Sequence, residues 1–163
     1  MVRNKKGVTL VELMITVALV TILASVGGVM FTKINEFFFM SRARTEVQRD
    51  ARLILGLLNR NLRQGDANSI LLTKHPGQPP YSKISFTKQQ GTQMSFYQSD
   101  NRLIMTSGTT NKTLSENLRY IAFSFPMSDD MGIVSISLTM EKSTYRGQSK
   151  AMHLAVEKVR VMN

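Results

Sequence analysis

The chain has 163 residues, enough for one domain and an appendage. It contains no cysteine, which excludes disulfide bonds and cysteine-based metal sites. Twenty-one Lys and Arg residues against 11 Asp and Glu give a formal charge of +10, and a solvated basic surface is the simplest interpretation of that excess.

A short basic leader opens the chain and a long apolar run follows it. Three basic residues precede Gly7, and residues 8–31 then contain a single ionisable group, Glu12. A helix over this run is about 36 Å long and can cross a hydrocarbon core of about 30 Å. A secretory signal peptide, with a core of about 7 to 15 residues, remains the alternative because residues 23–25 read LAS. The basic leader predicts a cytoplasmic N-terminus, so we expect a single-pass protein of the bacterial inner membrane with its head outside the cytoplasm.

Glu12 is the unexpected residue of the apolar run. A carboxylate in a spanning helix costs about 2 to 3 kcal/mol at the middle of the bilayer and less near its surface. If the chain is cleaved between Gly7 and Val8, the new Val8 amine is largely protonated and lies one helical turn from Glu12. In apolar surroundings the two charges need each other, or partners from another subunit. The alternative is a purely structural role, because a negative charge stabilises a helix N-terminus.

The segment KKGVTLVELMITVALVTILA resembles the class III signal of type IV pilins and their relatives. The shared features are the basic leader, Gly7, an apolar mature start, Thr9 and the run from Leu10 to Glu12. The resemblance implies that a prepilin peptidase cleaves after Gly7 and methylates the Val8 amine. It also implies that Glu12 meets the amine of a neighbouring pilin or pseudopilin, with inner-membrane lipid and assembly platform proteins as further partners.

The apolar helix lacks one feature of many major pilins, a proline further along its length. This chain has Gly27 and Gly28 there. Glycine in a helix interior costs about 1 kcal/mol relative to alanine, so local melting of the helix at this point stays open.

From residue 32 the apolar pattern becomes amphipathic. Apolar side chains recur every three or four residues, and charged residues occupy the other faces. The stripe comprises Val47, Ala51, Ile54 or Leu55, Leu58 and Leu62. We expect it to pack on a sheet, with a coiled-coil partner as the alternative. Gly65 is expected to end the helix, which would run from Thr9 to Gln64 over about 84 Å.

Beyond Gly65 the sequence predicts short β-strands. A proline-rich loop precedes three alternating segments that predict an antiparallel meander, and residues 106–117 look like a polar loop. The phase of the last apolar segment shifts between Val156 and Val159, which predicts a bulge or a strand covered on both faces. The expected strands are 83–88, 93–98, 102–107, 118–125, 133–142 and 153–162.

These elements predict an α+β, pilin-like fold with a long N-terminal helix packed on antiparallel sheets. The expected divisions are the leader 1–7, a membrane and filament-core half 8–31, an amphipathic half 32–65 and a β-rich head 66–163. The segments LLNRNLRQG, FYQSDNRLIM, ENLRYIAFSF and VRVMN resemble minor pilins of the W kind or the pseudopilin J of type II secretion.

The sequence shows no catalytic constellation, so we expect no enzyme activity, no cofactor and no resident metal. His75 and His153 lie far apart and lack carboxylates at ligand spacing. Asp129 and Asp130 form a weak candidate for a calcium contact, with a simple turn as the alternative.

The expected function is that of a minor structural subunit, in the initiating or tip complex of a type IV pilus or a type II secretion pseudopilus. One alternative is a DNA-binding tip pilin of an uptake or competence pilus. It would use the charge of +7 that remains when the three leader positives are removed. The other alternative is an uncut membrane-anchored domain.

Overall fold

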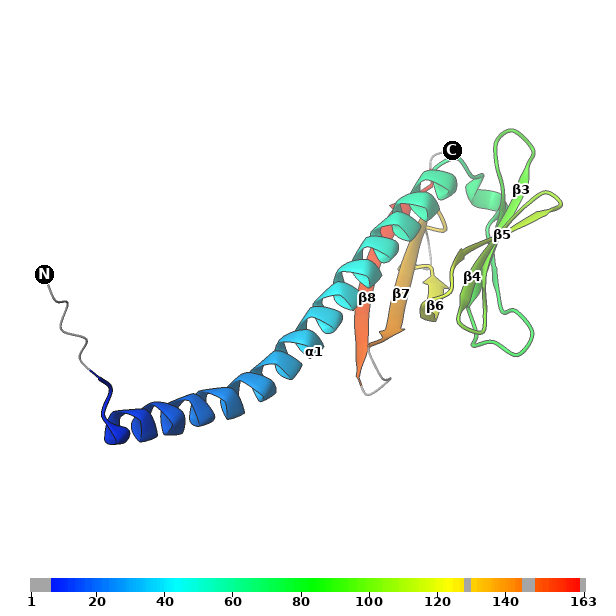
Figure 1. Cartoon of the computed structure of the whole chain (residues 1–163). Helices are drawn as coiled ribbons and strands as arrows, with labels where there is room; N and C mark the ends of the chain where they lie inside the picture. The colour runs from blue at the N-terminus through cyan, green and yellow to red at the C-terminus, as the bar shows by residue number, and fades with distance from the viewer. Residues whose placement is uncertain (1–6, 128–129, 145–148, 162–163) are drawn as a thin grey trace, which may run out of the picture. The chain divides into compact units, whose positions relative to one another are not determined.

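The computed structural model describes residues 7–127, 130–144 and 149–161 (Figure 1). Their elements are one long helix, a short 3-10 helix and strands that all pair antiparallel. The bounds are α1 Leu10–Leu62, η1 Ala67–Ser69, β1 Leu71–Thr73, β2 Lys83–Thr87, β3 Gln93–Ser99, β4 Arg102–Ser107, β5 Thr110–Ser115, β6 Leu118–Ser124, β7 Ile133–Ser143 and β8 Lys150–Arg160. The predicted α+β, pilin-like arrangement is confirmed.

The chain divides into two compact units, Met1–Phe39 and Met40–Asn163. In the described part of the first unit, every side chain of α1 is exposed, although most are apolar. The Thr and Ser hydroxyls of this part bond to carbonyl oxygens three or four residues earlier, and these hydroxyls belong to Thr16, Thr21, Ser25 and Thr32. Helical backbone and back-bonded hydroxyls leave little polar surface, so α1 is compatible with a hydrocarbon environment. By length and composition, α1 is able to cross a membrane.

In the second unit, one face of α1 forms part of the core. Val47, Leu58 and Leu62 are fully buried and belong to one apolar cluster with residues of both sheets. The predicted stripe is therefore confirmed, and its buried members are Ala43, Val47, Ala51, Ile54, Leu55, Leu58 and Leu62.

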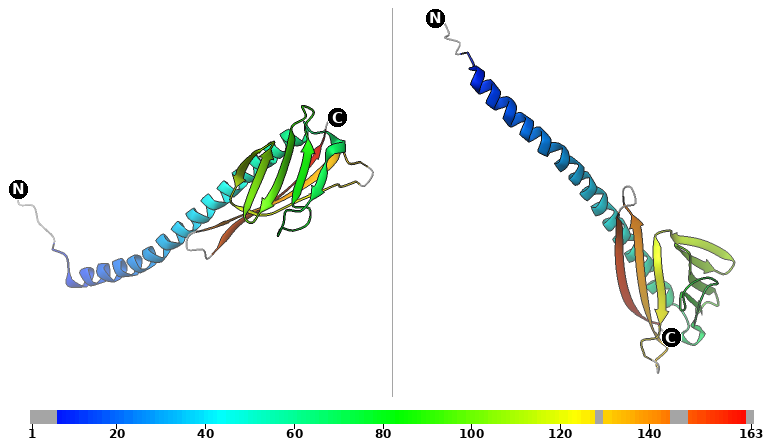
Figure 2. Two further views of the ribbon diagram at one scale, coloured as in Figure 1. Left: turned by 90° about the vertical axis from the view of Figure 1, so that its right-hand side faces the viewer. Right: turned by 90° about the horizontal axis from the view of Figure 1, so that it is seen from below.

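Strands β1 to β5 form one antiparallel sheet in sequential order (Figure 2). The predicted meander is confirmed in β2, β3 and β4. The predicted loop over residues 106–117 is wrong, because Thr110–Ser115 pairs with β4 as the edge strand β5. Its side chains are exposed and polar except at its end, so the strand shows no apolar alternation. Backbone pairing, together with the 2.7 Å hydrogen bond between Thr106 and Asn111, defines it.

Strands β6, β7 and β8 form a second antiparallel sheet, and the predicted hairpin is confirmed as β6 and β7. The prediction for the last strand is wrong in both of its forms. β7 and β8 pair in unbroken register from Ile133↔Arg160 to Ser143↔Lys150, so β8 has no bulge. Its outer face is open, because Met152, Leu154 and Val156 are exposed. The apparent phase shift arises because these apolar residues occupy outward positions.

A buried glutamine joins the two sheets. The Gln98 side-chain amide donates to the carbonyl oxygens of Asp100 (2.9 Å) and Arg119 (3.2 Å). Its oxygen accepts from the Ile121 backbone N–H at 3.2 Å. Since Gln98 lies on β3 and Ile121 on β6, this side chain satisfies backbone groups across the gap between the sheets.

The predicted stop at Gly65 is also confirmed. The Gly65 N–H donates to the Leu62 carbonyl at 2.9 Å, and the Asp66 N–H donates to Thr87 at 2.9 Å. The helix end thereby meets the end of β2. A Cβ at position 65 would lie 2.8 Å from the ring of Phe86, so the close approach requires glycine.

Candidate assembly motif at the N-terminus

The bond between Gly7 and Val8 lies in irregular backbone just before α1. Residues 7–9 are non-helical and exposed, and Val8 is 70% exposed. Exposed, irregular chain is where proteases gain access most readily. The structure therefore leaves this bond open to a peptidase.

Gly7 has no role in the fold that would require glycine. The position is exposed, and within the described residues an added Cβ would meet nothing within 4 Å. The reason for glycine here must therefore lie outside the folded chain.

Thr9 and Glu12 begin the helix together. The Glu12 N–H donates to the Thr9 hydroxyl at 3.3 Å, and the Leu13 N–H donates to the Thr9 carbonyl at 3.1 Å. Thr-x-x-Glu is the spacing of a capping box, in which the threonine is the N-cap. Sequence analysis treated Glu12 as a partner for the Val8 amine or as a charge near the helix N-terminus; it did not predict the cap, although the Thr-x-x-Glu spacing signals it.

The Glu12 carboxylate remains available despite this capping contact. Glu12 is exposed, and its side chain forms no ion pair with any residue in the described ranges. The capping contact uses its backbone N–H alone. A structural role of the backbone and an assembly role of the carboxylate are therefore compatible.

Gly27 and Gly28 lie within continuous helix in this structure. Both are exposed, and a Cβ at either position would meet nothing within 4 Å. Local melting of the helix at this turn in a filament is a possibility that the sequence raised and the structure does not test.

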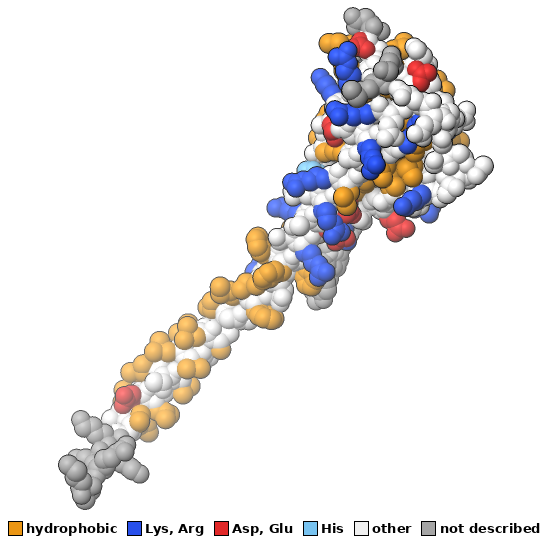
Figure 3. Space-filling model, turned by 90° about the horizontal axis from the view of Figure 1, so that it is seen from above, with side chains coloured by type: hydrophobic (Ala, Val, Ile, Leu, Met, Phe, Trp, Pro, Cys, Tyr) orange, Lys and Arg blue, Asp and Glu red, His pale blue; other side chains and the backbone are white. Residues whose placement is uncertain are grey.

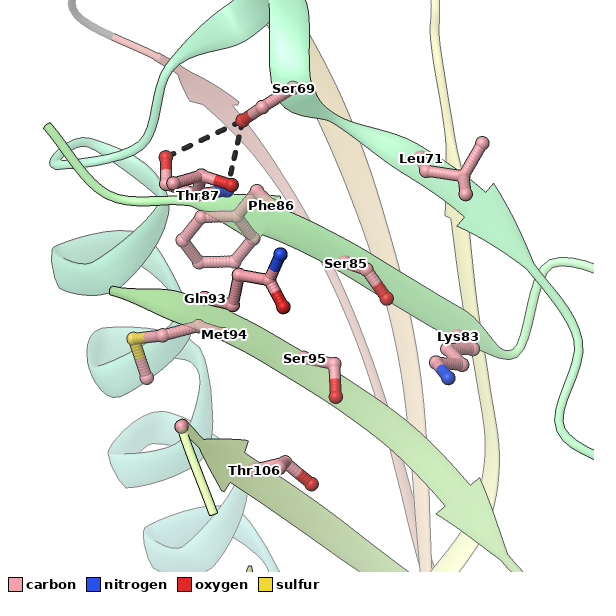
Figure 4. Close-up of a pocket in the computed structure, with 11 residues that line it drawn as sticks. Ser69, Leu71, Lys83, Ser85, Phe86, Thr87, Gln93, Met94, Ser95 and Thr106 are labelled. Atoms are coloured by element: carbon pink, nitrogen blue, oxygen red, sulfur yellow. Dashed lines mark hydrogen bonds between the residues drawn. The ribbon is translucent and has the colours of Figure 1, made fainter. Parts of the chain in front are cut away.

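A shallow hollow of the head lies on the outer face of β2, β3 and β4 (Figure 4). It encloses about 310 Å³ and is lined mainly by hydroxyl and amide side chains, with Lys83 as the charged member. Ser69 accepts from the Thr87 N–H at 2.9 Å and donates to the Asp66 carbonyl at 2.7 Å, so it fastens η1 to β2. The lining holds no pair of nucleophile and base.

The candidate histidines and acids form no site in the part of the chain that the structure describes. His75 stacks on Tyr97 with ring centroids 4.5 Å apart, and His153 lies on β8 far along the chain. Asp129 falls outside the described residues. Asp130 accepts from the Gly132 N–H at 2.8 Å, which is a turn contact. No group of three potential metal ligands occurs within the described ranges.

One ion pair links β7 to α1, and a cluster of three charged side chains links β6, β7 and β8. Lys142 of β7 bonds Glu46 of α1, and this contact keeps the pKa of Glu46 below its ordinary value. Glu141 accepts from Lys150 at 2.5 Å and lies 3.7 Å from Arg119. The hydrogen bond from Lys150 is the main cause that lowers the pKa of Glu141.

The long helix with an apolar and an amphipathic half, the antiparallel head and the capped N-terminal motif are the features of a type IV pilin-like protein. Comparison with protein families supports this class, because residues 2–28 match the prokaryotic N-terminal methylation motif. Comparison with curated proteins and with solved structures gives no match. The apolar helix and the motif fit a membrane-anchored pilin or pseudopilin-like subunit, and the motif indicates a structural role.

Proposed function

We propose that the chain is a minor structural subunit in the initiating or tip complex of a type IV pilus or a type II secretion pseudopilus. Residues 1–7 form the leader and 8–31 the membrane and filament-core half of the helix. Residues 32–65 form the amphipathic half, and 66–163 form the head.

The observation that carries the proposal is the unexplained glycine at the leader junction. Gly7 is exposed, and an added Cβ would meet nothing within 4 Å in the part of the chain that the structure describes, yet it stands inside a matched N-terminal methylation motif. A peptidase that accepts only a residue without a side chain beside the scissile bond accounts for it. Cleavage releases the Val8 amine, which is then methylated.

Glu12 supplies the contact for assembly. Its exposed carboxylate lacks an ion-pair partner within the described chain, and an uncompensated charge in an apolar environment is costly. The positively charged Val8 amine of a neighbouring subunit offers the compensation. Other pilins or pseudopilins are therefore the main partners, with assembly platform proteins at the membrane.

The topology follows from the charge of the leader. Its basic residues remain in the cytoplasm, the helix crosses the inner membrane, and the head lies outside. Processing then transfers the subunit from the membrane to the filament.

Mass spectrometry of the chain from cells with an active prepilin peptidase tests the proposal. The mature N-terminus should be Val8 carrying one methyl group. Gly7→Val should leave the leader in place, because its side chain would occupy the space beside the scissile bond. Gly27→Val is the matched control, since it also adds a valine side chain to an open glycine position of the motif, and it should still be cleaved. An intact leader on the unaltered chain would instead favour the uncut membrane-anchored domain.

A further inference from the structure

The second part of α1 carries an exposed face opposite its buried stripe. We call it the arginine face. At about 3.6 residues per turn, its arginines fall within a sector of about 80°, and all are exposed. On the surface drawn in Figure 3, Lys and Arg side chains gather along this part of the helix. The face consists of Arg42, Arg49, Arg52, Arg60 and Arg63. Gly56 lies within this sector and Leu53 lies about 20° beyond its edge, and both stand between Arg52 and Arg60 along the helix.

Most charges of this face are not used by the fold. Arg49 approaches Asp50 at 3.5 Å. Arg52, Arg60 and Arg63 form no ion pair with any residue in the described ranges. Residues 42–63 contain six arginines, no lysine and two acids. Arginine presents a planar fork that pairs two oxygens of one carboxylate or phosphate, so the face is suited to an anionic partner.

Leu53 and Gly56 show what kind of partner fits. Leu53 is 65% exposed, although it stands on the same helix as a complete buried stripe. Gly56 sits in the helix interior, where glycine costs about 1 kcal/mol relative to alanine. A Cβ at Gly56 would meet nothing within 4 Å, so the chain's own packing gives no reason for it. A missing side chain beside an exposed leucine allows a second helix to approach closely.

This combination favours a protein over a nucleic acid. Phosphate contacts require cations, and they do not call for an exposed leucine or a missing side chain. An exposed apolar side chain beside arginines is typical of a protein interface, where arginine is enriched.

A second copy of this chain is a poor partner. Two arginine faces repel each other, because like charges across an interface are costly. The described head acids without an ion pair are Asp66, Asp100, Glu116, Asp130 and Glu157. The first four each stand alone in a different connection between elements, and Glu157 of β8 accepts from the Asn59 side-chain amide at 2.5 Å. They form no acidic row that could oppose five arginines.

We propose that the arginine face binds the acidic face of an α-helix from a different filament subunit, with Leu53 and Gly56 at the centre of the contact. The inference rests on the proposed role as a filament subunit. It adds that the positive charge of the arginine face favours binding to a different subunit and disfavours binding to a second copy of this chain.

Site-specific cross-linking of the full chain in native membranes tests this. The chain has no cysteine, so Leu53→Cys introduces a single thiol for a thiol-to-amine cross-linker. Mass spectrometry should identify a second chain with its own N-terminal methylation motif and an acidic helix. Arg52→Glu with Arg60→Glu should lower the yield at least about ten-fold, and exchanging the partner's acids for arginine should restore it.

Two controls isolate the face. Arg102→Glu with Lys112→Glu makes the same change in net charge on exposed positions of the five-stranded sheet, and the yield should stay within about two-fold. Gly56→Leu should lower the yield as strongly as the arginine reversals. Gln48→Leu adds the same side chain at an exposed position of the helix outside the arginine face, and it should not.

The inference is wrong if the main adduct is a second copy of this chain. It is equally wrong if the thiol labels nucleic acid or gives no protein adduct, or if the arginine reversals leave the yield unchanged. The N-terminus of each variant is measured in parallel. If the chain is cleaved after Gly7 and gives any of these results, only the proposed binding partner is contradicted. If the chain is not cleaved, the proposed function is contradicted.

Discussion

At the scale of single residues, the capping contact of Glu12 and its proposed assembly contact involve different atoms. Its N–H meets the Thr9 hydroxyl at 3.3 Å, while its carboxylate is exposed and unpaired within the described chain. Substitution of the carboxylate therefore tests assembly without removing the threonine cap.

We expect Glu12→Val to insert into the membrane as the unaltered chain does, because it removes a polar group from an apolar helix. Incorporation into filaments should fall, since the Val8 amine of the neighbour loses its counter-charge. Glu12→Gln separates the two roles, because it keeps the size and loses the charge. Quantitative immunoblots of membranes and sheared filaments measure both steps. Normal incorporation of Glu12→Gln would leave Glu12 with a structural role alone.

Replacing glycine by alanine should change the stability of the head in opposite directions at Gly65, just after α1, and at Gly56, within α1. Gly65→Ala should destabilise the head, because the new Cβ would lie 2.8 Å from a Phe86 ring that is itself buried. Gly56→Ala should stabilise it by about 0.5 to 1 kcal/mol, since the position is open and alanine is the better helix former.

The sequence offers a clean probe for these effects. It contains no tryptophan, and all four tyrosines lie beyond residue 80. Near-ultraviolet circular dichroism of the full chain in detergent therefore reports on the head. Equal melting temperatures for the two variants would contradict the assignment of Gly65 to a close contact.

At the scale of elements, the contact between α1 and the sheets should dominate the stability of the head. Leu58 is fully buried in the common cluster with residues of both sheets. Leu58→Ala should cost about 2 to 5 kcal/mol, a large part of the stability of about 5 to 15 kcal/mol that is ordinary for a domain. Leu53→Ala is the control on the exposed side of the same helix. A loss below about 1 kcal/mol at Leu58 would contradict the packing of this stripe on the sheets.

At the scale of the whole molecule, acid should weaken the link between α1 and β7. Lys142 lowers the pKa of Glu46 below its ordinary value of 4.5, so the stabilisation is present above that value. It is lost as the pH falls from about 4.5 through the lowered value. Because about a third of each side chain is exposed, the contribution should be well below 1 kcal/mol.

Glu46→Gln should therefore make the head less sensitive to acid as the pH falls below about 4.5. Glu36→Gln is a suitable comparison, since Glu36 forms an exposed pair with Lys33 on the same helix. Melting temperatures against pH measure the difference. An identical acid response in all three chains would mean that the Lys142 contact adds nothing to stability.

Local periodicity was sufficient to predict the elements whose side chains alternate between core and solvent. The stripe from Val47 to Leu62, the meander and the hairpin of β6 and β7 were all predicted for that reason. β1 and β5 were not, because a three-residue strand and an exposed polar edge strand have no periodic burial to reveal them. Their pairing depends on backbone hydrogen bonds to a neighbouring strand that folding brings close.

For the candidate site, too, some features were predictable from the sequence and others depended on the tertiary structure. The basic leader, Gly7, the apolar helix and Glu12 were all identified from the sequence, because the motif that contains them lies within one stretch of chain. Only tertiary structure decided that Gly65 meets Phe86, that Gln98 joins two sheets and that Met152, Leu154 and Val156 lie outward. It also decided that Leu53 is exposed and that a Cβ at Gly56 would meet nothing within 4 Å among the described residues. The physical reason is that burial and open space depend on which distant segments pack together, and no local pattern records that.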